Sequence, residues 1–262
     1  EIVSRPYPRR SVMAWGPKER AIGRASFFAR AMKGETRLFA IEGLNEECPK
    51  DQITLNTDLA GEARVKGKSA TVVVRIEGSR RPPSSDLPAT VQTILFDQES
   101  VKLAPGQAAI VAQGEAVPKV RTLAAGDRIT LSVSTSGFPW EAMDNAIAGG
   151  PQLIENGTVM LGDEGFRPDI MEGRAPRTAA GWTADGTWIL CVVDGRQPES
   201  VGATLPELAE LLRRQGCMQA MNLDGGGSSA MNVLGLLLNR PSDAAGERPV
   251  ANALAIRGLR PI

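Results

Sequence analysis

The chain has 262 residues, of which 42% are hydrophobic, 23% are charged and none is histidine. This composition is ordinary for a folded protein and excludes collagen-like and disordered chains. Thirty basic residues balance thirty acidic ones, and a net charge of zero predicts no nucleic-acid partner and no global attraction to anionic membranes. The lack of histidine excludes Ser-His-Asp, Cys-His and histidine–metal active sites.

No stretch reaches the roughly 18 apolar residues of a membrane-spanning helix, so no membrane insertion is expected. The chain opens with Glu-Ile-Val, so a leader or a longer segment is expected to have preceded residue 1. Cys48, Cys191 and Cys217 are too few for a disulfide framework. One disulfide that involves Cys48 stays open, and Cys191 is expected as a small buried residue.

The sequence pattern of residues 1–136 predicts that this half of the fold is rich in β-strands. Alternating or β-branched stretches lie between turns, and they predict strands at 37–41, 52–55, 70–76, 92–96, 108–112 and 128–133. One helix is expected around 25–32. A loop rich in Ser, Arg and Pro is expected at 78–88.

Residues 137–262 differ in character. The continuous apolar run 188–193 predicts a strand covered on both faces. Residues 204–216 predict a helix, in which Thr204 is the N-cap, Glu207 completes a capping box and Gly216 ends the helix. Its apolar face is expected to carry Leu205, Leu208, Leu211 and Leu212. A second strand is expected at 218–223.

Strand, helix and strand form a βαβ unit, whose two strands run parallel and end at one edge of the sheet. Asp194 and Asp224 each follow one of these strands. If the strands are direct neighbours, the two carboxylates lie within one or two strand spacings of ~4.8 Å. The predicted fold is therefore α+β or mixed α/β, with a β-rich N-terminal half, a βαβ-containing C-terminal half and the site at the carboxyl edge of the strands.

The segment Asp224-Gly-Gly-Gly-Ser-Ser229 carries the strongest motif. Three glycines suit a backbone that approaches an oxyanion, with amides and hydroxyls as donors. The alternative is a tight hairpin turn before a strand at 230–234. Arg177, Arg196, Arg240 and Arg248 add guanidinium forks that match phosphate geometry.

Two other glycine-bearing segments are interpreted as structural turns or loops. Asp185-Gly186 is expected as the hairpin turn between strands at 179–183 and 187–193. The segment Asn145 to Pro151 is by itself a loop.

Together these motifs resemble the phosphodiester glycosidase family. The resemblance is carried by Asn145 to Pro151, Arg177 to Gly181, Val193 to Arg196, Ser200 to Leu208, Asn222 to Ser229, Asn239 to Asp243 and Glu247 to Asn252. It is dense from about residue 140 and implies a single family domain over 1–262. Family members usually carry an early Asn-Gly-Gly-Phe-Phe-like stretch, which Ser26-Phe-Phe28 matches poorly, so a leading segment is expected to be missing.

The resemblance implies a hydrolase that cleaves a sugar-1-phosphodiester at the anomeric carbon and releases free sugar and a phosphomonoester. Asp224 and Asp194 are the catalytic candidates, as base or nucleophile. The phosphate would lie among Arg177, Arg196, Gly225, Gly226, Gly227, Ser228 and Ser229. Further substrate contacts are expected from Asn145, Gly149, Gly150, Thr178, Asn239, Arg240, Asp243, Glu247 and Arg248.

Two other functions stay open. Asp194 and Asp224 could hold Mg²⁺ or Ca²⁺ in a metal-dependent phosphoesterase, although no cofactor is expected for the glycosidase. The chain could also be a non-catalytic module that binds polysaccharide or cell wall. The expected partner is a glycosyl phosphate or a polysaccharide such as an exopolysaccharide, and the expected location is secreted, periplasmic or cell-surface.

Overall fold

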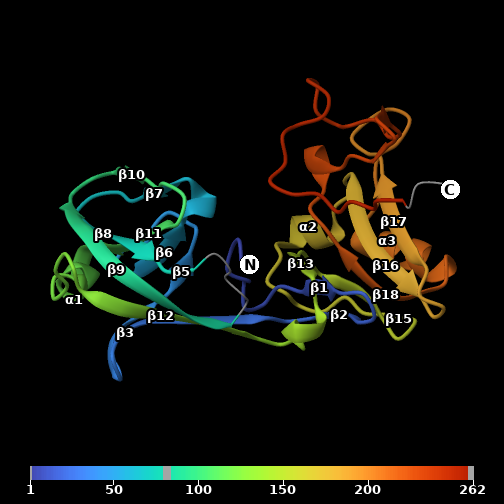
Figure 1. Ribbon diagram of the computed structural model, residues 1–262. Coiled ribbons are helices and arrows are strands. Elements are labelled where there is room, and N and C mark those ends of the chain that lie inside the picture. The colour runs from blue at the N-terminus through green and yellow to red at the C-terminus, as the bar shows by residue number, and fades with distance from the viewer. Residues whose placement is uncertain (1, 79–83, 259–262) are drawn as a thin grey trace. The chain divides into compact units, whose positions relative to one another are not determined.

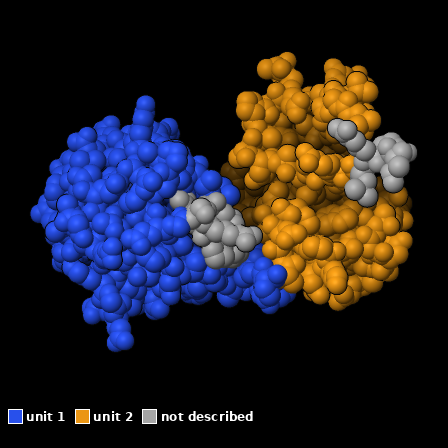
Figure 2. Space-filling view, viewed as in Figure 1, with its two compact units in different colours: residues 1–8, 25–141 blue, residues 9–24, 142–262 orange. Residues whose placement is uncertain are grey.

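The structure is a computed structural model that describes residues 2–78 and 84–258 (Figure 1). The chain forms two compact units, shown in separate colours in Figure 2. The first comprises residues 1–8 and 25–141, and the second comprises residues 9–24 and 142–262. Residues 9–24 thus leave the β-rich N-terminal part and fold with the C-terminal part. Among the described helices, none is long and apolar enough to cross a membrane.

The first unit is built on an eight-stranded sheet in the order β4-β3-β12-β9-β8-β11-β6-β5. Its neighbours are antiparallel, except the parallel pair β5 and β6. The strands are β3 (Ser26–Lys33), β4 (Thr36–Ile41), β5 (Gly43–Leu44), β6 (Ile53–Thr57), β8 (Ser69–Ile76), β9 (Ser85–Phe96), β11 (Gln107–Gln113) and β12 (Arg128–Ser136). All six strands predicted for this half are confirmed.

Smaller elements complete the first unit. The strands β7 (Glu62–Arg64) and β10 (Ser100–Lys102) pair with each other. The helices are α1 (Val117–Val120) and the 3-10 turns η1 (Asp58–Ala60), η2 (Gly114–Ala116) and η3 (Trp140–Ala142). The main core lies on one side of the large sheet, where alternate residues such as Val72, Ile110 and Leu131 are fully buried.

Two sequence predictions for this unit need correction. The segment 25–32, predicted as a helix, is strand β3, because it pairs with β12 on one side and β4 on the other. Its alanines favour a helix locally, but sheet pairing outweighs local preference. The loop predicted at 78–88 is shorter, since β9 begins at Ser85; residues 79–83 lie outside the described residues.

The second unit contains a five-stranded sheet in the order β15-β14-β18-β16-β17, in which all neighbours are antiparallel. Its strands are β14 (Gln152–Glu155), β15 (Thr158–Val159), β16 (Arg177–Thr183), β17 (Trp188–Val193) and β18 (Cys217–Asn222). A three-stranded sheet has the order β13-β1-β2, with β1 (Val12–Trp15), β2 (Arg20–Gly23) and β13 (Asn145–Ala148). The remaining elements are α2 (Pro168–Glu172), α3 (Leu205–Arg214), η4 (Gly226–Ser228), β19 (Asn232–Val233) and β20 (Leu236–Leu237).

The five-stranded sheet is covered on both faces. Helix α3 packs on one face through Leu205, Leu208 and Leu212. The three-stranded sheet covers the other face, where Met13 contacts Met221 and Trp182 in one cluster. Strand β17 lies at the sheet edge, and all of its residues are only partly buried. The run 188–193 therefore has neighbours on both faces, as predicted, but they cover it incompletely.

The βαβ prediction is correct in part. Strands β17 and β18 run in the same direction and are connected through α3, but β16 lies between them and is antiparallel to both. Direct pairing of the two strands is therefore wrong, and the sheet is antiparallel rather than parallel. The hairpin at Asp185-Gly186, which joins β16 to β17, is confirmed, and Gly186 has a φ of +86°.

Local chemistry determines where α3 begins. Thr204 accepts a hydrogen bond from the Glu207 amide, and the Glu207 side chain bonds back to the Thr204 amide, which is the predicted capping box. Leu211 was expected on the buried face but is 42% exposed. All three cysteines are free thiols, so no disulfide forms at Cys48. Burial raises the pKa of the Cys217 thiol to about 11.

The difference between Leu208 and Leu211 can be measured. Leu208→Ala removes a fully buried side chain and should lower the free energy of unfolding by about 2–5 kcal/mol. Leu211→Ala is the matched control and should cost less than about 1 kcal/mol. Urea denaturation followed by tryptophan fluorescence reports mainly on the second unit, which holds three of the four tryptophans, Trp15, Trp182 and Trp188. Equal losses in the two variants would contradict the position of α3.

Candidate active site

Three strand ends of the second unit meet at one edge of the five-stranded sheet. Strands β17 and β18 end there, and β16, which is antiparallel to both, begins there (Figure 1). Asp194 therefore follows β17, Asp224 follows β18 after one residue, and Arg177 opens β16 opposite Val193. Both aspartates thus follow strands that end at the same edge, as the sequence predicted, although β16 lies between the two strands.

The carboxylate of Asp224 is exposed and nearly uncommitted. Its only hydrogen bond within the described residues comes from the adjacent amide of Gly225, at 3.0 Å from Oδ1. No cation neutralises it through an ion pair in that part of the chain. This side chain is free to accept a proton or to contact a ligand.

The carboxylate of Asp194 has a different environment. Oδ1 accepts hydrogen bonds from Asn239 Nδ2 at 3.0 Å and from the Arg240 amide at 3.0 Å, and Oδ2 lies 3.2 Å from the same amide. Asn239 also donates to the Ser229 carbonyl at 3.1 Å and accepts from the Met231 amide at 2.7 Å. Asp194 therefore holds the 239–240 segment, and Asn239 connects that segment to the end of the glycine turn.

The glycine turn packs against the start of β16. A Cβ at Gly225 would lie 2.8 Å from the Pro176 carbonyl oxygen, which no real side chain tolerates. The Gly226 amide donates to that same oxygen at 2.9 Å, and Gly226 has a φ of +63°, a conformation that favours glycine. The three-residue η4 turn follows directly.

Two guanidiniums lie beside this turn. A Cβ at Gly226 would be 3.2 Å from Nη1 and 3.4 Å from Nη2 of Arg196, so the guanidinium lies over the glycine. A Cβ at Gly227 would lie 2.2 Å from Arg248 Nη2, and Arg248 Nε donates to Asp243 Oδ2 at 2.7 Å. A side chain at Gly227 would therefore displace the ends of the Arg248 and Asp243 side chains.

Arg196 is the uncommitted cation of this edge. Its side chain is exposed, and it makes no hydrogen bond or ion pair with any described residue. Other arginines at the edge are engaged: Arg240 pairs with Glu199 at 3.3 Å, and Arg248 pairs with Asp243. An anion at the turn would find the Arg196 charge available.

Arg177 is buried and holds the local backbone. Its Nε donates to the Ala203 carbonyl at 2.9 Å, and its Nη2 donates to the carbonyls of Ile170 at 2.9 Å and Gly173 at 2.6 Å. Burial lowers the pKa of the Arg177 guanidinium, and the nearby charge of Arg196 lowers this pKa further. The contribution of Arg177 to anion binding is therefore limited to its remaining donors and its charge.

Five other predicted residues lie at the same edge or next to it. Thr178 Oγ1 donates to Ser229 Oγ at 3.1 Å, and Ser228 lies in η4, so these belong to the same edge. Gly149 and Gly150 pack against the end of β18, where the Gly150 amide donates to the Asn222 carbonyl at 2.7 Å.

Two predicted residues are not brought to this edge by any observed contact. Asn145 pairs with Trp15, and Trp15 in turn pairs with Arg20, which bonds the Gly186 carbonyl at the opposite end of β16 and β17. Asn145 therefore lies toward the far end of the sheet. Glu247 is exposed and makes no hydrogen bond or ion pair with the described residues of the turn.

Sequence reasoning missed two buried polar residues near Gly150. Asn222 Nδ2 donates to the Gly150 carbonyl at 2.8 Å. Glu164 is 4% exposed and accepts from the Ser11 amide at 2.8 Å, the Ser11 hydroxyl at 2.6 Å and the Gln152 amide at 2.9 Å. Asn222 is part of the glycine motif, whereas Glu164 stands in no pattern that the sequence could indicate.

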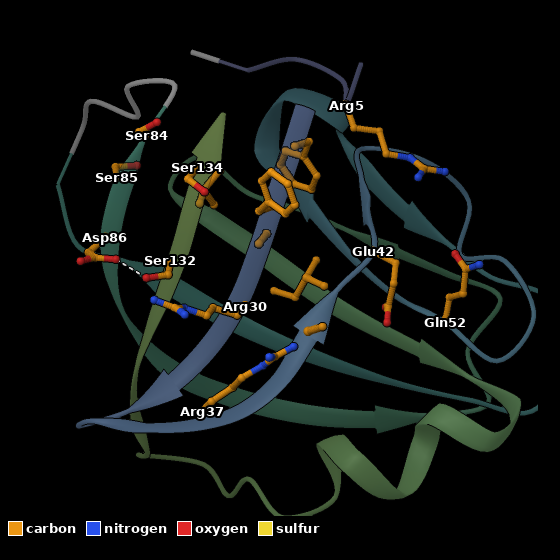
Figure 3. A pocket seen from close by; sticks show the side chains of 16 residues that line it. Arg5, Arg30, Arg37, Glu42, Gln52, Ser84, Ser85, Asp86, Ser132 and Ser134 are labelled. Atoms are coloured by element: carbon orange, nitrogen blue, oxygen red, sulfur yellow. Dashed lines mark hydrogen bonds between the residues drawn. The ribbon is translucent and has the colours of Figure 1, made fainter. Parts of the chain in front are cut away.

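The edge offers carboxylate oxygens, but no group of three or more His, Cys, Asp or Glu side chains suited to a metal occurs among the described residues. A large hollow, of about 1050 Å³, lies in the first unit and contains none of the residues discussed above (Figure 3). The sheet edge is the candidate site because the uncommitted Asp224 and Arg196 lie there.

The contrast between the two aspartates yields a stability test. Asp194→Ala removes the acceptor of the Asn239 and Arg240 donors and should lower the free energy of unfolding by about 2 kcal/mol, since each bond to a charged group contributes about 1.5–3 kcal/mol. Asp224→Ala is the control and should change it by less than about 0.5 kcal/mol. The comparison uses denaturation midpoints, and a larger loss at Asp224 would contradict the assigned environments.

Comparison with known proteins identifies a family and several relatives of this chain. The model of the phosphodiester glycosidase family matches residues 71–257. The mouse N-acetylglucosamine-1-phosphodiester alpha-N-acetylglucosaminidase is 36% identical over 102 residues, which cover 35% of this chain and 20% of that protein. The uncharacterized prophage-derived protein YomE of Bacillus subtilis is 43% identical over 81 residues, 31% of this chain and 12% of that protein. The chain thus matches only a small part of the length of these relatives.

Two solved structures share the fold over most of the chain. A hypothetical protein from Synechocystis superposes with a TM-score of 0.73 and 26% identity, over 91% of this chain and 44% of that chain. A protein from Burkholderia pseudomallei shares the fold, with a TM-score of 0.71, 22% identity, and coverage of 94% of this chain and 56% of that chain. Because the family model matches more than half of the sequence, the chain belongs to the phosphodiester glycosidase family.

Proposed function

We propose that the protein hydrolyses a sugar-1-phosphodiester at the anomeric carbon and releases free sugar and a phosphomonoester. The observation that carries this proposal is the pair of uncommitted, oppositely charged groups at one edge. Asp224 offers a free carboxylate, and Arg196 offers a free guanidinium over the adjacent glycine turn. Family membership supports the general activity.

The charge changes of the reaction fit these two groups. A phosphodiester carries one negative charge, and the departing phosphomonoester carries close to two at neutral pH. The bond between C1 and the bridging oxygen breaks, and its electron pair goes to the phosphate. Arg196 would stabilise the charge that develops there, because a preformed cation acts most strongly where charge appears in the transition state. The phosphate needs little protonation as it leaves, so no histidine is required.

Asp224 is proposed as the general base. It would accept a proton from a water molecule whose oxygen forms the new bond to C1, and solvent would later remove that proton. Asp194 is proposed as a positioning residue, because its carboxylate already accepts hydrogen bonds from Asn239 and Arg240. Its role would be to hold the segment that carries these residues against the turn.

The substrate and the location of the protein are also proposals. We propose a glycosyl phosphate or an exopolysaccharide as substrate, and a location outside the cytoplasm. Both rest on the family resemblance alone. The match covers a minor part of the curated relatives, so their substrates are not assigned to this chain.

Loss of the Asp224 carboxylate should affect the rate and spare the fold. Asp224→Asn keeps the shape and one acceptor oxygen but cannot take up a proton, so kcat should fall by about 10² to 10⁴. The thermal midpoint should stay within about 1 °C, because the side chain is exposed. Turnover of an aryl sugar-1-phosphodiester measures kcat, and an active Asp224→Asn enzyme would remove Asp224 as the base.

Isotope incorporation distinguishes the glycosidase from a phosphoesterase. In ¹⁸O-labelled water, cleavage at C1 places the label in the free sugar, whereas attack at phosphorus places it in the phosphomonoester. We expect the label in the sugar, measured by mass spectrometry of both products. Label in the phosphomonoester, together with inhibition by a chelator, would support the metal-dependent alternative. Binding without turnover would support a non-catalytic module.

A further inference from the structure

The first unit contains a hollow that the proposed reaction does not use. Its volume is about 1050 Å³, at the upper end of the range of roughly 300–1,000 Å³ that small-molecule sites occupy. It is lined by side chains of β3, β4, β9 and β12 and by Arg5. Figure 3 shows these side chains converging from several strands.

The centre of the lining is formed by alternate residues of β3. Phe28 and Arg30 are exposed, in alternation with partly or fully buried neighbours. Phe28 pairs across the sheet with Ser134, and Arg30 pairs with Ser132 on one side and Ala40 on the other. Since serine and alanine are small, the neighbouring strands leave room beside the phenyl ring and the guanidinium.

Several polar groups of the hollow already have partners. Asp86 Oδ1 accepts a hydrogen bond from the Ser132 hydroxyl, which Figure 3 marks. Glu42 Oε2 accepts from the Ile53 amide at 2.9 Å, and Arg5 forms an ion pair with Glu46 at 2.7 Å. Each of the two carboxylates of the lining therefore accepts one hydrogen bond, and one of its three arginines is paired.

The groups that have no partner define what could bind. Arg30 and Arg37 are exposed and make no hydrogen bond or ion pair within residues 2–78 and 84–258. The Ser134 hydroxyl has none there either, and Phe28 is 63% exposed. In Figure 3 the Arg37 side chain reaches from β4 toward the middle of the hollow. Within the described residues, the lining thus offers two unpaired cations, the Ser134 hydroxyl, the Gln52 side-chain amide and one aromatic face, whereas each of its carboxylates already accepts a hydrogen bond.

We propose that this hollow, defined by Phe28, Arg30, Arg37 and Ser134, binds an acidic glycan, that is, a sugar chain that carries carboxylate, sulfate or phosphate groups. Guanidinium forks bind such anions through paired charge-assisted hydrogen bonds. The aromatic face can pack against the C–H face of a sugar ring, and the serine hydroxyl can bond to a sugar hydroxyl. A neutral glycan would leave both guanidiniums unused. The proposal does not depend on the reaction assigned to the second unit.

Binding to oligosaccharides of equal length tests this proposal. Isothermal titration calorimetry compares tetragalacturonate, which is acidic, with maltotetraose, which is neutral. The protein carries Asp224→Asn throughout, so cleavage cannot affect the result. We expect tetragalacturonate to bind at least about tenfold more tightly than maltotetraose. We also expect Arg30→Ala combined with Arg37→Ala to weaken tetragalacturonate binding by at least about tenfold.

A matched double variant controls for net charge. Arg121→Ala combined with Arg128→Ala removes two exposed arginines of the same unit that do not line the hollow, and it should leave binding within about twofold. Equal losses in the two double variants would overturn the proposal, because they would indicate unspecific attraction. Equal affinity for the two sugars would also overturn it, as would tighter binding of tetraglutamate or of a four-nucleotide single-stranded DNA. Thermal melting confirms that each variant is folded.

Discussion

The candidate site depends on the close approach of two loops, at three glycines, to the backbone of Ala175 and Pro176. A Cβ at Gly195 would lie 2.7 Å from the Pro176 nitrogen, one at Gly202 would lie 2.5 Å from the Ala175 carbonyl, and one at Gly225 would lie 2.8 Å from the Pro176 carbonyl. These glycines let the loops after β17 and β18 pack on the start of β16. Strand β16 separates β17 from β18, but this packing brings the loops after both strands together. Residues from the three strand ends therefore share one surface.

Two aspartates that look alike in the sequence have different environments. Both follow a strand that ends at the same edge, so the pattern alone predicts a similar role for each. The difference arises from Asn239, which lies 45 residues after Asp194 and connects its carboxylate to the Ser229 carbonyl. Asp224 has no such partner among the described residues. A loop that is distant in the sequence thus determines which of the two carboxylates is free for chemistry. No local sequence pattern indicates this difference.

The sequence was sufficient where the physical signal is local. The capping box at Thr204, the hairpin at Asp185-Gly186 and the alternating strands of the first unit are encoded by neighbouring residues, and all are confirmed. It failed where distant pairing decides. The segment 25–32 has the composition of a helix but is flanked by two strands. The position of β16 between β17 and β18 and the burial of Glu164 likewise depend on contacts across the chain.

The path of the chain between the units has a consequence for how the protein is synthesised. Ala25–Glu141 interrupts the second unit, which begins with Arg9–Arg24 and resumes only at Ala142. Met13 of β1 is fully buried against residues as late as Met221. At about 5–20 residues per second, the ribosome releases those partners on the order of ten seconds after β1. During that interval the first unit can complete its sheet, while the apolar face of β1 and β2 stays uncovered. The nascent chain is therefore most vulnerable to misassociation through its first two strands.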